Sequence, residues 1–471
     1  MSDPGGPGNP GPPGPEAQAA PPGLFDGVLA RGAVREAVGD RAWLQAMLDF
    51  EAALARAEAR AGIVPADDAA AIGQACRADR FDVADLARAA ADTGTPAAAL
   101  VRALTAAVGG RAAGHVHHGA TSQDVVDTAA MLVASRALAP LLDDLDGAAA
   151  AAAALADRHR ATLMAGRTLL QQALPIPFGL EAAAWLAGLD ETAARLEAVR
   201  VGRLAVQLGG AAGTLASLGA AGPAVLGYLG EELGLVVPVL PWHATRGRVA
   251  ELAGALGAGA GAVAKVARDV TLLAQTEVGE VREVREVREG KAGGSSTMPH
   301  KQNPVAAVAA AACAARAPGL VATLLVAMAQ EHQRAAGAWH AEQRPLSDLL
   351  EATGSAAAWL RECLEGLEVD AGRMRANLDA TGGLLLAERV TGALAPSLGR
   401  LAAHDLVAAA CDEAVASRRP LAGVLGARPE IRARLAPAEI EALLDPAGYL
   451  GSAGVFIDRA LAAHAARRRR G

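Results

Sequence analysis

Small, polar and basic residues are concentrated in one segment, Gly293 to Pro304, which reads GGSSTMPHKQNP. Two adjacent glycines allow the backbone to turn sharply and to expose its N–H groups. Asn303 and Pro304 are typical of the N-cap and the first residue of a helix, and Lys301 adds a mobile positive charge beside them. Because a helix start carries a positive dipole end and unpaired N–H groups, the segment predicts an anion-binding loop. When its residues are considered one at a time, the segment is explained equally well as a flexible loop before a capped helix.

Two other segments combine glycine with histidine, threonine and glutamine. His117 to Ala129 reads HHGATSQDVVDTA, in which Thr121 and Asp124 have the spacing of a helix capping box. Gly166 to Gly179 reads GRTLLQQALPIPFG. Judged from its residues alone, the first segment could simply be the start of a helix. The second could simply be a loop between two helices.

Together the three segments resemble the signature segments of the fumarase/aspartase superfamily, whose loop pattern is G-S-S-x-M-P-x-K-x-N-P. The resemblance implies that Ser295 is the base that removes a proton from carbon beside a carboxylate. It implies that Lys301 and Asn303 bind that carboxylate and the negative charge that develops on it, with His117 near the substrate. The substrate-binding residues that it implies are Thr121, Ser122, Thr168, Gln171, Ser296 and Met298.

The resemblance covers nearly all of the chain after residue 23 and is closest to the muconate cycloisomerase branch. Leu169 stands where hydrolyases and ammonia- or nucleotide-releasing relatives have histidine. Leucine cannot donate the proton that an amine or hydroxide leaving group needs, whereas a carboxylate, with a pKa of about 4, needs far less help. The resemblance therefore implies an intramolecular lyase of aromatic-acid breakdown, which converts 3-carboxy-cis,cis-muconate into a carboxymuconolactone.

Two alternatives stay open. A succinate-type lyase that releases fumarate, similar to nitrosuccinate or adenylosuccinate lyase, satisfies the same argument if its leaving group is weakly basic, as nitrite is. A non-catalytic structural protein on this scaffold is disfavoured by the intact Ser295, Lys301 and Asn303.

Further contacts of the substrate are less defined by the residues. The charged stretch from Val281 to Ala292 is expected to be a solvated face. Additional carboxylates of the substrate could be bound by Arg246, Arg334 and Arg344. Arginines on the surface of a helical bundle are, however, more often solvated. The sequence departs from the pattern of the branch at Thr95, Gly247 and Gln343. These departures cast doubt on the identity of the substrate more than on the type of reaction.

Composition favours an enzyme with no metal, cofactor, nucleic-acid or membrane partner. The formal net charge of −7 disfavours a general nucleic-acid binder. Histidines lack metal-ligand spacing, and the 4 cysteines lie far apart, which fits a reducing cytoplasm. Residues 305–329 are the one stretch that resembles a membrane span, but Arg316, Pro318 and many alanines favour a bundle helix.

Helices are the elements that must position these segments. Alanine dominates the apolar residues, which predicts closely packed long helices and not sheets. Apolar residues at three- and four-residue steps predict an amphipathic helix from Asp40 to Gly62. Longer helical patterns, which suggest an elongated bundle, occupy residues 124–160, 178–208, 246–280, 304–333 and 345–367.

The predicted fold is all-α with three folded domains, over residues 23–120, 121–366 and 367–471, the second being the long-helix bundle. Residues 1–22 are a Pro/Gly-rich arm, expected to be disordered and without the features of a signal peptide. The resemblance implies a fumarase/aspartase-like homotetramer, in which each active site gathers the three segments from three different subunits.

Overall fold

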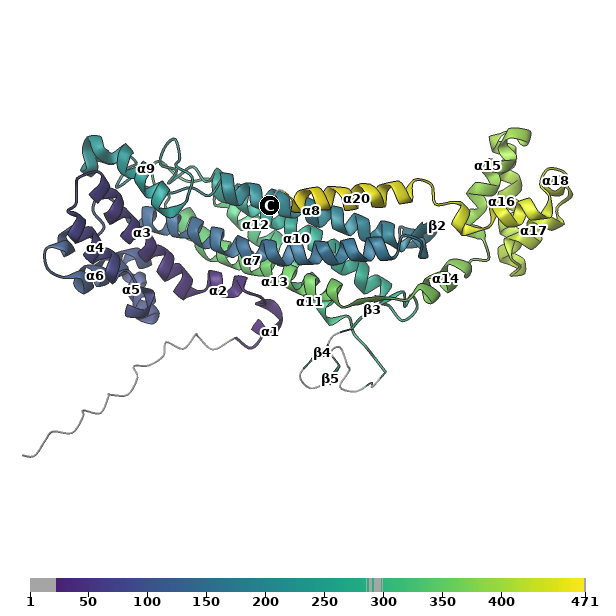
Figure 1. Cartoon of the computed structure of the whole chain (residues 1–471), viewed down its shortest axis with the longest axis horizontal. Coiled ribbons are helices and arrows are strands. Elements are labelled where there is room, and N and C mark those ends of the chain that lie inside the picture. Colours follow the sequence, from purple (N-terminus) through teal and green to yellow (C-terminus); the bar gives the residue numbers. More distant parts are fainter. Residues whose placement is uncertain (1–22, 285, 288–289, 292–297, 299, 470–471) are drawn as a thin grey trace, which may run out of the picture. The chain divides into compact units, whose positions relative to one another are not determined.

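The computed structural model describes residues 23–469, apart from residues 285, 288–289, 292–297 and 299. These residues are mostly helical (Figure 1). They form two compact units. The first unit contains residues 23–31, 39–133 and 205–243, and the second contains residues 32–38, 134–204 and 244–469. The arm over residues 1–22 lies outside the described residues, and the division into three domains at residues 120 and 366 stays a prediction.

The first unit is organised around α3 (Asp40–Arg60), which confirms the helix predicted between Asp40 and Gly62. Met47, Phe50 and Leu54 are buried on this helix, which packs against α4 and α9. The other helices of the unit are α1 (Asp26–Leu29), α4 (Ala66–Ala75), α5 (Val83–Thr93), α6 (Pro96–Val108), α9 (Gly222–Leu233) and the start of α7 (Ser122–Arg158).

Long helices lie side by side in the second unit, where α10 (Gly247–Leu273) packs against α8 (Phe178–Gly202), α11 (Val305–Ala314), α12 (Ala317–Val326) and α13 (Ala338–Glu365) (Figure 1). The single helix predicted over residues 304–333 is wrong, because a turn at residues 315–316 separates α11 from α12. Pro318 stands in the first turn of α12, where its missing N–H costs least. The remaining helices are α2 (Val34–Val38), α14 (Ala371–Asp379), α15 (Ala387–Leu398), α16 (Arg400–Ser417), α17 (Leu421–Ala427), α18 (Pro429–Arg432), α19 (Pro437–Leu443) and α20 (Ala453–Arg468), which packs along α8.

Short strands also occur, so the expectation of helices alone was too simple. Among the described residues three antiparallel pairs form: β1 (Leu163–Thr168) with β2 (Gln171–Pro177), β3 (Val281–Glu283) with β6 (Leu367–Val369), and β4 (Glu286–Val287) with β5 (Gly290–Lys291). The first pair makes the GRTLLQQ segment a β-hairpin and not the plain loop that its residues suggested.

By length and apolar composition alone, three described helical stretches could cross a membrane: Ser122–Arg158, Gly247–Leu273 and Val305–Val326. Only the third of these stretches was considered as a membrane span from the sequence. Alanine supplies much of the hydropathy in all three, and alanine drives membrane insertion weakly.

Candidate active site

The HHGATSQD segment begins with a strained backbone. His117 has a φ of 59°, in the left-handed region that residues with a side chain seldom adopt. Gly119 follows with a φ of 70°, and a Cβ there would lie 2.6 Å from the side chain of Leu218. Only glycine fits this position, so the turn that presents His117 depends on it.

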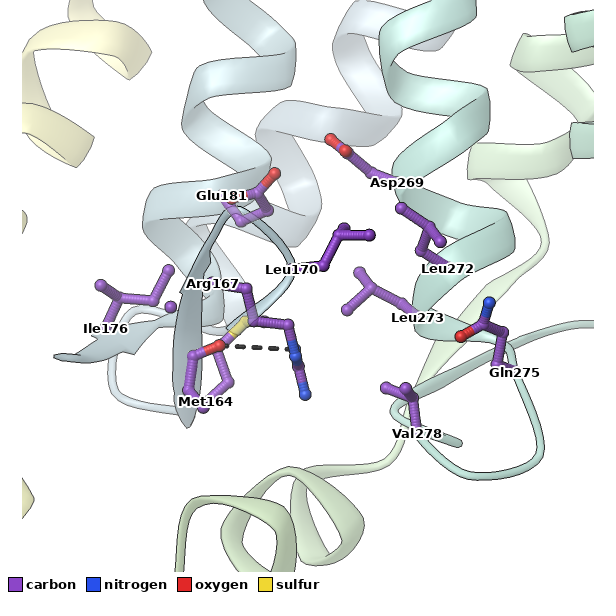
Figure 2. Close-up of a pocket in the computed structure, with 12 residues that line it drawn as sticks. Met164, Arg167, Leu170, Ile176, Glu181, Asp269, Leu272, Leu273, Gln275 and Val278 are labelled. Carbon is purple, nitrogen blue, oxygen red and sulfur yellow. Dashed lines mark hydrogen bonds between the residues drawn. The ribbon is translucent and has the colours of Figure 1, made fainter. Parts of the chain in front are cut away.

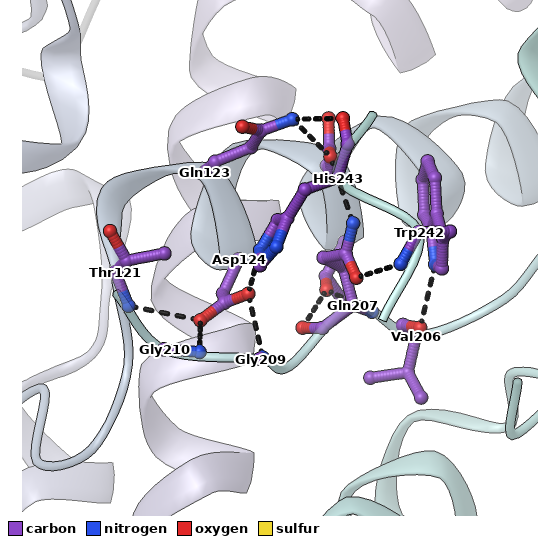
Figure 3. Close-up of polar contacts among 11 residues, drawn as sticks. Thr121, Gln123, Asp124, Val206, Gln207, Gly209, Gly210, Trp242 and His243 are labelled. Atoms are coloured by element: carbon purple, nitrogen blue, oxygen red, sulfur yellow. Dashed lines mark hydrogen bonds and ion pairs between the residues drawn. The ribbon is translucent and has the colours of Figure 1, made fainter. Parts of the chain in front are cut away.

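Asp124, in the first turn of α7, organises this region (Figure 3). Its buried carboxylate accepts hydrogen bonds from the backbone N–H groups of Thr121, Gly209 and Gly210, each at 3.0 Å. The Nε2 atom of buried His243 lies 2.6 Å from Oδ1 of the same carboxylate. The predicted capping contact between Thr121 and Asp124 is therefore present. Asp124 also joins Gly209, Gly210 and His243 to the start of α7.

His117 and His118 are each paired with a buried glutamate of α3. The Nδ1 atom of His117 lies 2.7 Å from Oε1 of Glu51, and that of His118 lies 2.8 Å from Oε1 of Glu58. Burial lowers the pKa of His117, but the hydrogen bond and charge of Glu51, with Asp124 and Glu58, raise it above its ordinary value. Burial raises the pKa of Glu58 to about 7, against the opposing effect of His118.

Sequence reasoning missed Glu51 and Glu58. A signal for them was present, because both stand inside the apolar stripe of the helix predicted from Asp40. Two acidic residues seven positions apart on the buried face of a helix need partners, since a charge is rarely buried alone.

Thr168 and Gln171 lie at the tip of the β1–β2 hairpin, where they face each other as the last residue pair. Leu169 and Leu170 form the turn between them, with φ values of 51° and 63° and exposures of 97% and 71%. All four residues are exposed, so described residues of the same chain form no pocket around Leu169. One residue before the tip, Arg167 forms two hydrogen bonds of 2.7 and 2.8 Å with Glu280.

A cavity of about 280 Å³ lies beside this hairpin and is lined mainly by Met164, Ile176, Leu272, Leu273 and Val278 (Figure 2). Arg167 also borders the cavity, but the carboxylate of Glu280 neutralises its guanidinium. The cavity therefore suits an apolar group better than a carboxylate.

The loop predicted to carry the base is described only in part. Ser295 and Ser296 lie outside the described residues, whereas Met298 and Lys301 are exposed and Asn303 is half-buried. α11 begins at Val305 with Pro304 as its N-cap. The helix therefore starts one residue later than predicted, since the prediction placed Asn303 at the N-cap and Pro304 as the first helical residue.

The predicted anion site at the start of α11 is already occupied by a carboxylate of the chain. Glu283 accepts hydrogen bonds from the backbone N–H groups of Ala306 at 2.9 Å and Ala307 at 2.7 Å. The expectation of unpaired N–H groups there was wrong for these two donors, and Glu283 is not part of a solvated face. Neighbouring Arg282 does lie exposed, beside Glu368.

Arg246 is also unavailable as a substrate-binding cation. Its guanidinium and the carboxylate of Glu342 are both buried and lie 2.6 Å apart. Because this pair neutralises the charge, Arg246 is better described as a structural residue of the second unit.

The three predicted segments therefore lie on separate elements of the chain. His117, Thr121 and Ser122 belong to the first unit. The hairpin tip and the residues before α11 belong to the second unit. Each segment is presented by its own local structure: a strained turn, a two-residue hairpin turn and a capped helix start.

Comparison with known proteins places the chain among lyases. A family model described as "Lyase" matches residues 29–319, and one described as "Adenylosuccinate lyase C-terminus" matches residues 383–460. The 3-carboxy-cis,cis-muconate cycloisomerase of Bradyrhizobium diazoefficiens is 51% identical, over 93% of this chain and 97% of the relative. The nitrosuccinate lyase of Streptomyces davaonensis is 46% identical, over 93% of this chain and 94% of the relative.

A solved structure agrees with these sequence relatives. The 3-carboxy-cis,cis-muconate lactonizing enzyme of Pseudomonas putida superposes with a TM-score of 0.88 at 45% identity, covering 94% of this chain and 99% of that structure. The resemblance drawn from the three segments is thereby confirmed, and the chain belongs to the lyase family of the fumarase/aspartase superfamily.

Proposed function

We propose that this protein is a cycloisomerase that converts 3-carboxy-cis,cis-muconate into a carboxymuconolactone. The observation that carries the proposal is Leu169, which provides no proton for a strongly basic leaving group. The high identity to cycloisomerases over nearly the whole chain supports it.

The reaction is an internal addition. A carboxylate oxygen of the substrate bonds to one carbon of a conjugated double bond, and the electron pair moves to the other carbon and its carboxylate. Ser295 then delivers a proton to that carbon, and in the reverse direction it removes the same proton. Lys301 and Asn303 stabilise the negative charge that develops on the carboxylate between these steps.

The active unit in this proposal is a cytoplasmic homotetramer whose sites draw on three subunits. Support comes from the tip of the β1–β2 hairpin, where Thr168, Leu169, Leu170 and Gln171 are all exposed. Leu169 is 97% exposed in its left-handed turn, so a neighbouring subunit is the natural partner for it. His117, Thr121 and Ser122 would come from another subunit in the same way.

A succinate-type lyase that releases nitrite is the second candidate. One observation favours it: the nitrosuccinate lyase relative is 46% identical over the same length. Leu169 is compatible with this activity as well, because nitrite is a weak base and leaves without a strong acid.

The deciding experiment compares the two substrates with the purified full chain. Loss of the diene absorbance of 3-carboxymuconate is expected, with little or no fumarate formed from nitrosuccinate. Ser295→Ala should abolish turnover, whereas Ser417→Ala, on the exposed face of α16, should leave it unchanged. Normal turnover by Ser295→Ala would contradict the assignment of the base, and faster release of fumarate would favour the second candidate.

A further inference from the structure

His117 is held by a carboxylate from a distant part of the chain. Its Nδ1 atom lies 2.7 Å from Oε1 of Glu51, a residue 66 positions away on α3. The Glu51 side chain is fully buried, while that of His117 keeps 17% exposure. This arrangement shields the carboxylate from solvent and leaves part of the imidazole accessible.

The backbone at His117, which makes this contact, is strained, with a φ of 59°. A residue with a side chain is disfavoured in the left-handed region, which is retained only where the surroundings enforce it. The same turn directs His118 to Glu58, one heptad further along α3. Two adjacent histidines thus reach two buried carboxylates on one face of a single helix.

The contact with Glu51 fixes the charge distribution of the imidazole ring. Carboxylate oxygens only accept, so Nδ1 of His117 carries a hydrogen and donates it. Among the described residues, no partner of the Nε2 atom is seen. The Oε2 atom of Glu51 is buried and likewise has no partner in the described part of the chain.

An ionised glutamate buried in this way is stabilised chiefly by a cation beside it. We infer that Glu51 is a positioning residue that keeps His117 as an imidazolium, so that its Nε2–H binds a carboxylate of the substrate. The inference rests on the proposed function, since it assigns a ligand of the same site. It also gives His117 an electrostatic task, which is the kind needed in a reaction that requires no strong acid.

The charged groups around the imidazole favour its protonated form. Glu51, Asp124 and Glu58 all raise its affinity for a proton, and the adjacent His118 is itself paired with Glu58. As pH rises through the pKa of His117 the imidazolium is lost, so substrate binding is expected to weaken on the alkaline side.

The test compares Glu51→Gln with the matched variant Glu58→Gln, which alters the pair at His118 instead. Histidine ring resonances of the full chain are titrated by NMR after selective labelling, and His117→Asn assigns the resonance of interest. Glu51→Gln should lower the pKa of His117 by at least about one unit, because the amide accepts the hydrogen bond without supplying a charge. Glu58→Gln should affect mainly His118.

Kinetics on 3-carboxymuconate supply the second measurement. In Glu51→Gln the alkaline limb of kcat/KM should move to lower pH by the same amount, with KM raised about tenfold and kcat changed only a few-fold. Glu51→Asp keeps the negative charge but has a shorter side chain. It should therefore raise KM without moving the alkaline limb of kcat/KM. This variant replaces Glu51→Gln in the test if the glutamine variant does not fold.

The outcomes separate the possibilities. An unchanged His117 titration in Glu51→Gln would overturn the positioning role. A shifted titration with an unmoved alkaline limb would overturn the contact between His117 and substrate. If the wild-type chain does not turn over 3-carboxymuconate, the proposed function fails, whereas the NMR result still decides whether Glu51 controls the charge of His117.

Discussion

The side chain of Glu283 and the backbone N–H of Ala307 are joined by a hydrogen bond of 2.7 Å, which ties β3 to the first turn of α11. A second bond, from the N–H of Ala306, engages the other carboxylate oxygen. The positive end of α11 is therefore neutralised from within the chain. In the proposed mechanism, Lys301 then supplies most of the positive charge that the substrate carboxylate meets before this helix.

Removing this cap should disturb the residues that precede α11. Glu283→Ala leaves two N–H groups without their acceptor, at a cost of about 1–2 kcal/mol. We expect a lower Tm and a reduced kcat/KM, because Lys301 and Asn303 lose a fixed helix start. Glu283→Gln should be intermediate, and Glu368→Gln, on the exposed partner strand, should match the wild type. Wild-type Tm and kinetics in Glu283→Ala would contradict this role.

Asp124→Asn should destabilise the first unit severely. The carboxylate serves three backbone donors and His243, and an amide of the same shape presents an NH2 group to some of these donors. A loss of roughly 3 kcal/mol or more is expected, visible as a lower Tm. Asp143→Asn, on the exposed side of the same helix, is the control. Equal melting of both variants would show that the Asp124 network is not critical for stability.

Lys301→Met should weaken transition-state stabilisation more than folding. The ammonium faces charge that grows during the reaction, so kcat and kcat/KM should fall together, by about 100-fold or more. Lys265→Met supplies the opposite pattern, because that lysine pairs with Glu181 and Asp269 and should change the Tm with unchanged kinetics. A lower Tm with normal kinetics in Lys301→Met would make that residue structural.

Leu169→His tests the argument about the leaving group. If a carboxylate leaves in the reverse direction, an imidazole at this position has no proton to transfer. Because it would also replace an apolar side chain by a polar one, cycloisomerase turnover should fall. The variant should not gain efficient release of a strong base, and Leu169→Met should retain most activity. Increased turnover of adenylosuccinate or argininosuccinate by Leu169→His, with slow turnover by the wild type, would place the protein with the amine-releasing lyases.

The pair of Glu58 and His118 predicts a pH dependence of stability. Burial raises the pKa of Glu58 from 4.5 to about 7, so the folded state binds this proton more tightly than the unfolded state. The stabilisation is complete below the unfolded value and is lost as pH rises through the folded value. Glu58→Gln should therefore flatten the decrease of Tm between about pH 5 and 7. Identical pH slopes in Glu58→Gln and in Glu231→Gln, an exposed control, would contradict the shift.

The sequence alone determined the helical character and the family, and it predicted which segments carry the site. Alanine-rich periodic patterns suffice for long helices, since helix propensity and amphipathicity are local properties. The string around Ser295, Lys301 and Asn303 identified the family because its residues are contiguous in the sequence. The contact between Thr121 and Asp124 was predictable for the same reason, as three-residue spacing is a local geometry.

Only the tertiary structure decided how those segments are supported. Glu51 is 66 positions from His117, and Glu283 reaches α11 only because β3 pairs with the distant strand β6. Contacts over such separations depend on how helices and strands pack, which no local pattern records. The turn at Leu169 and Leu170 is a further case: leucine does not favour a left-handed backbone, so the register of β1 with β2 imposes it against the local preference.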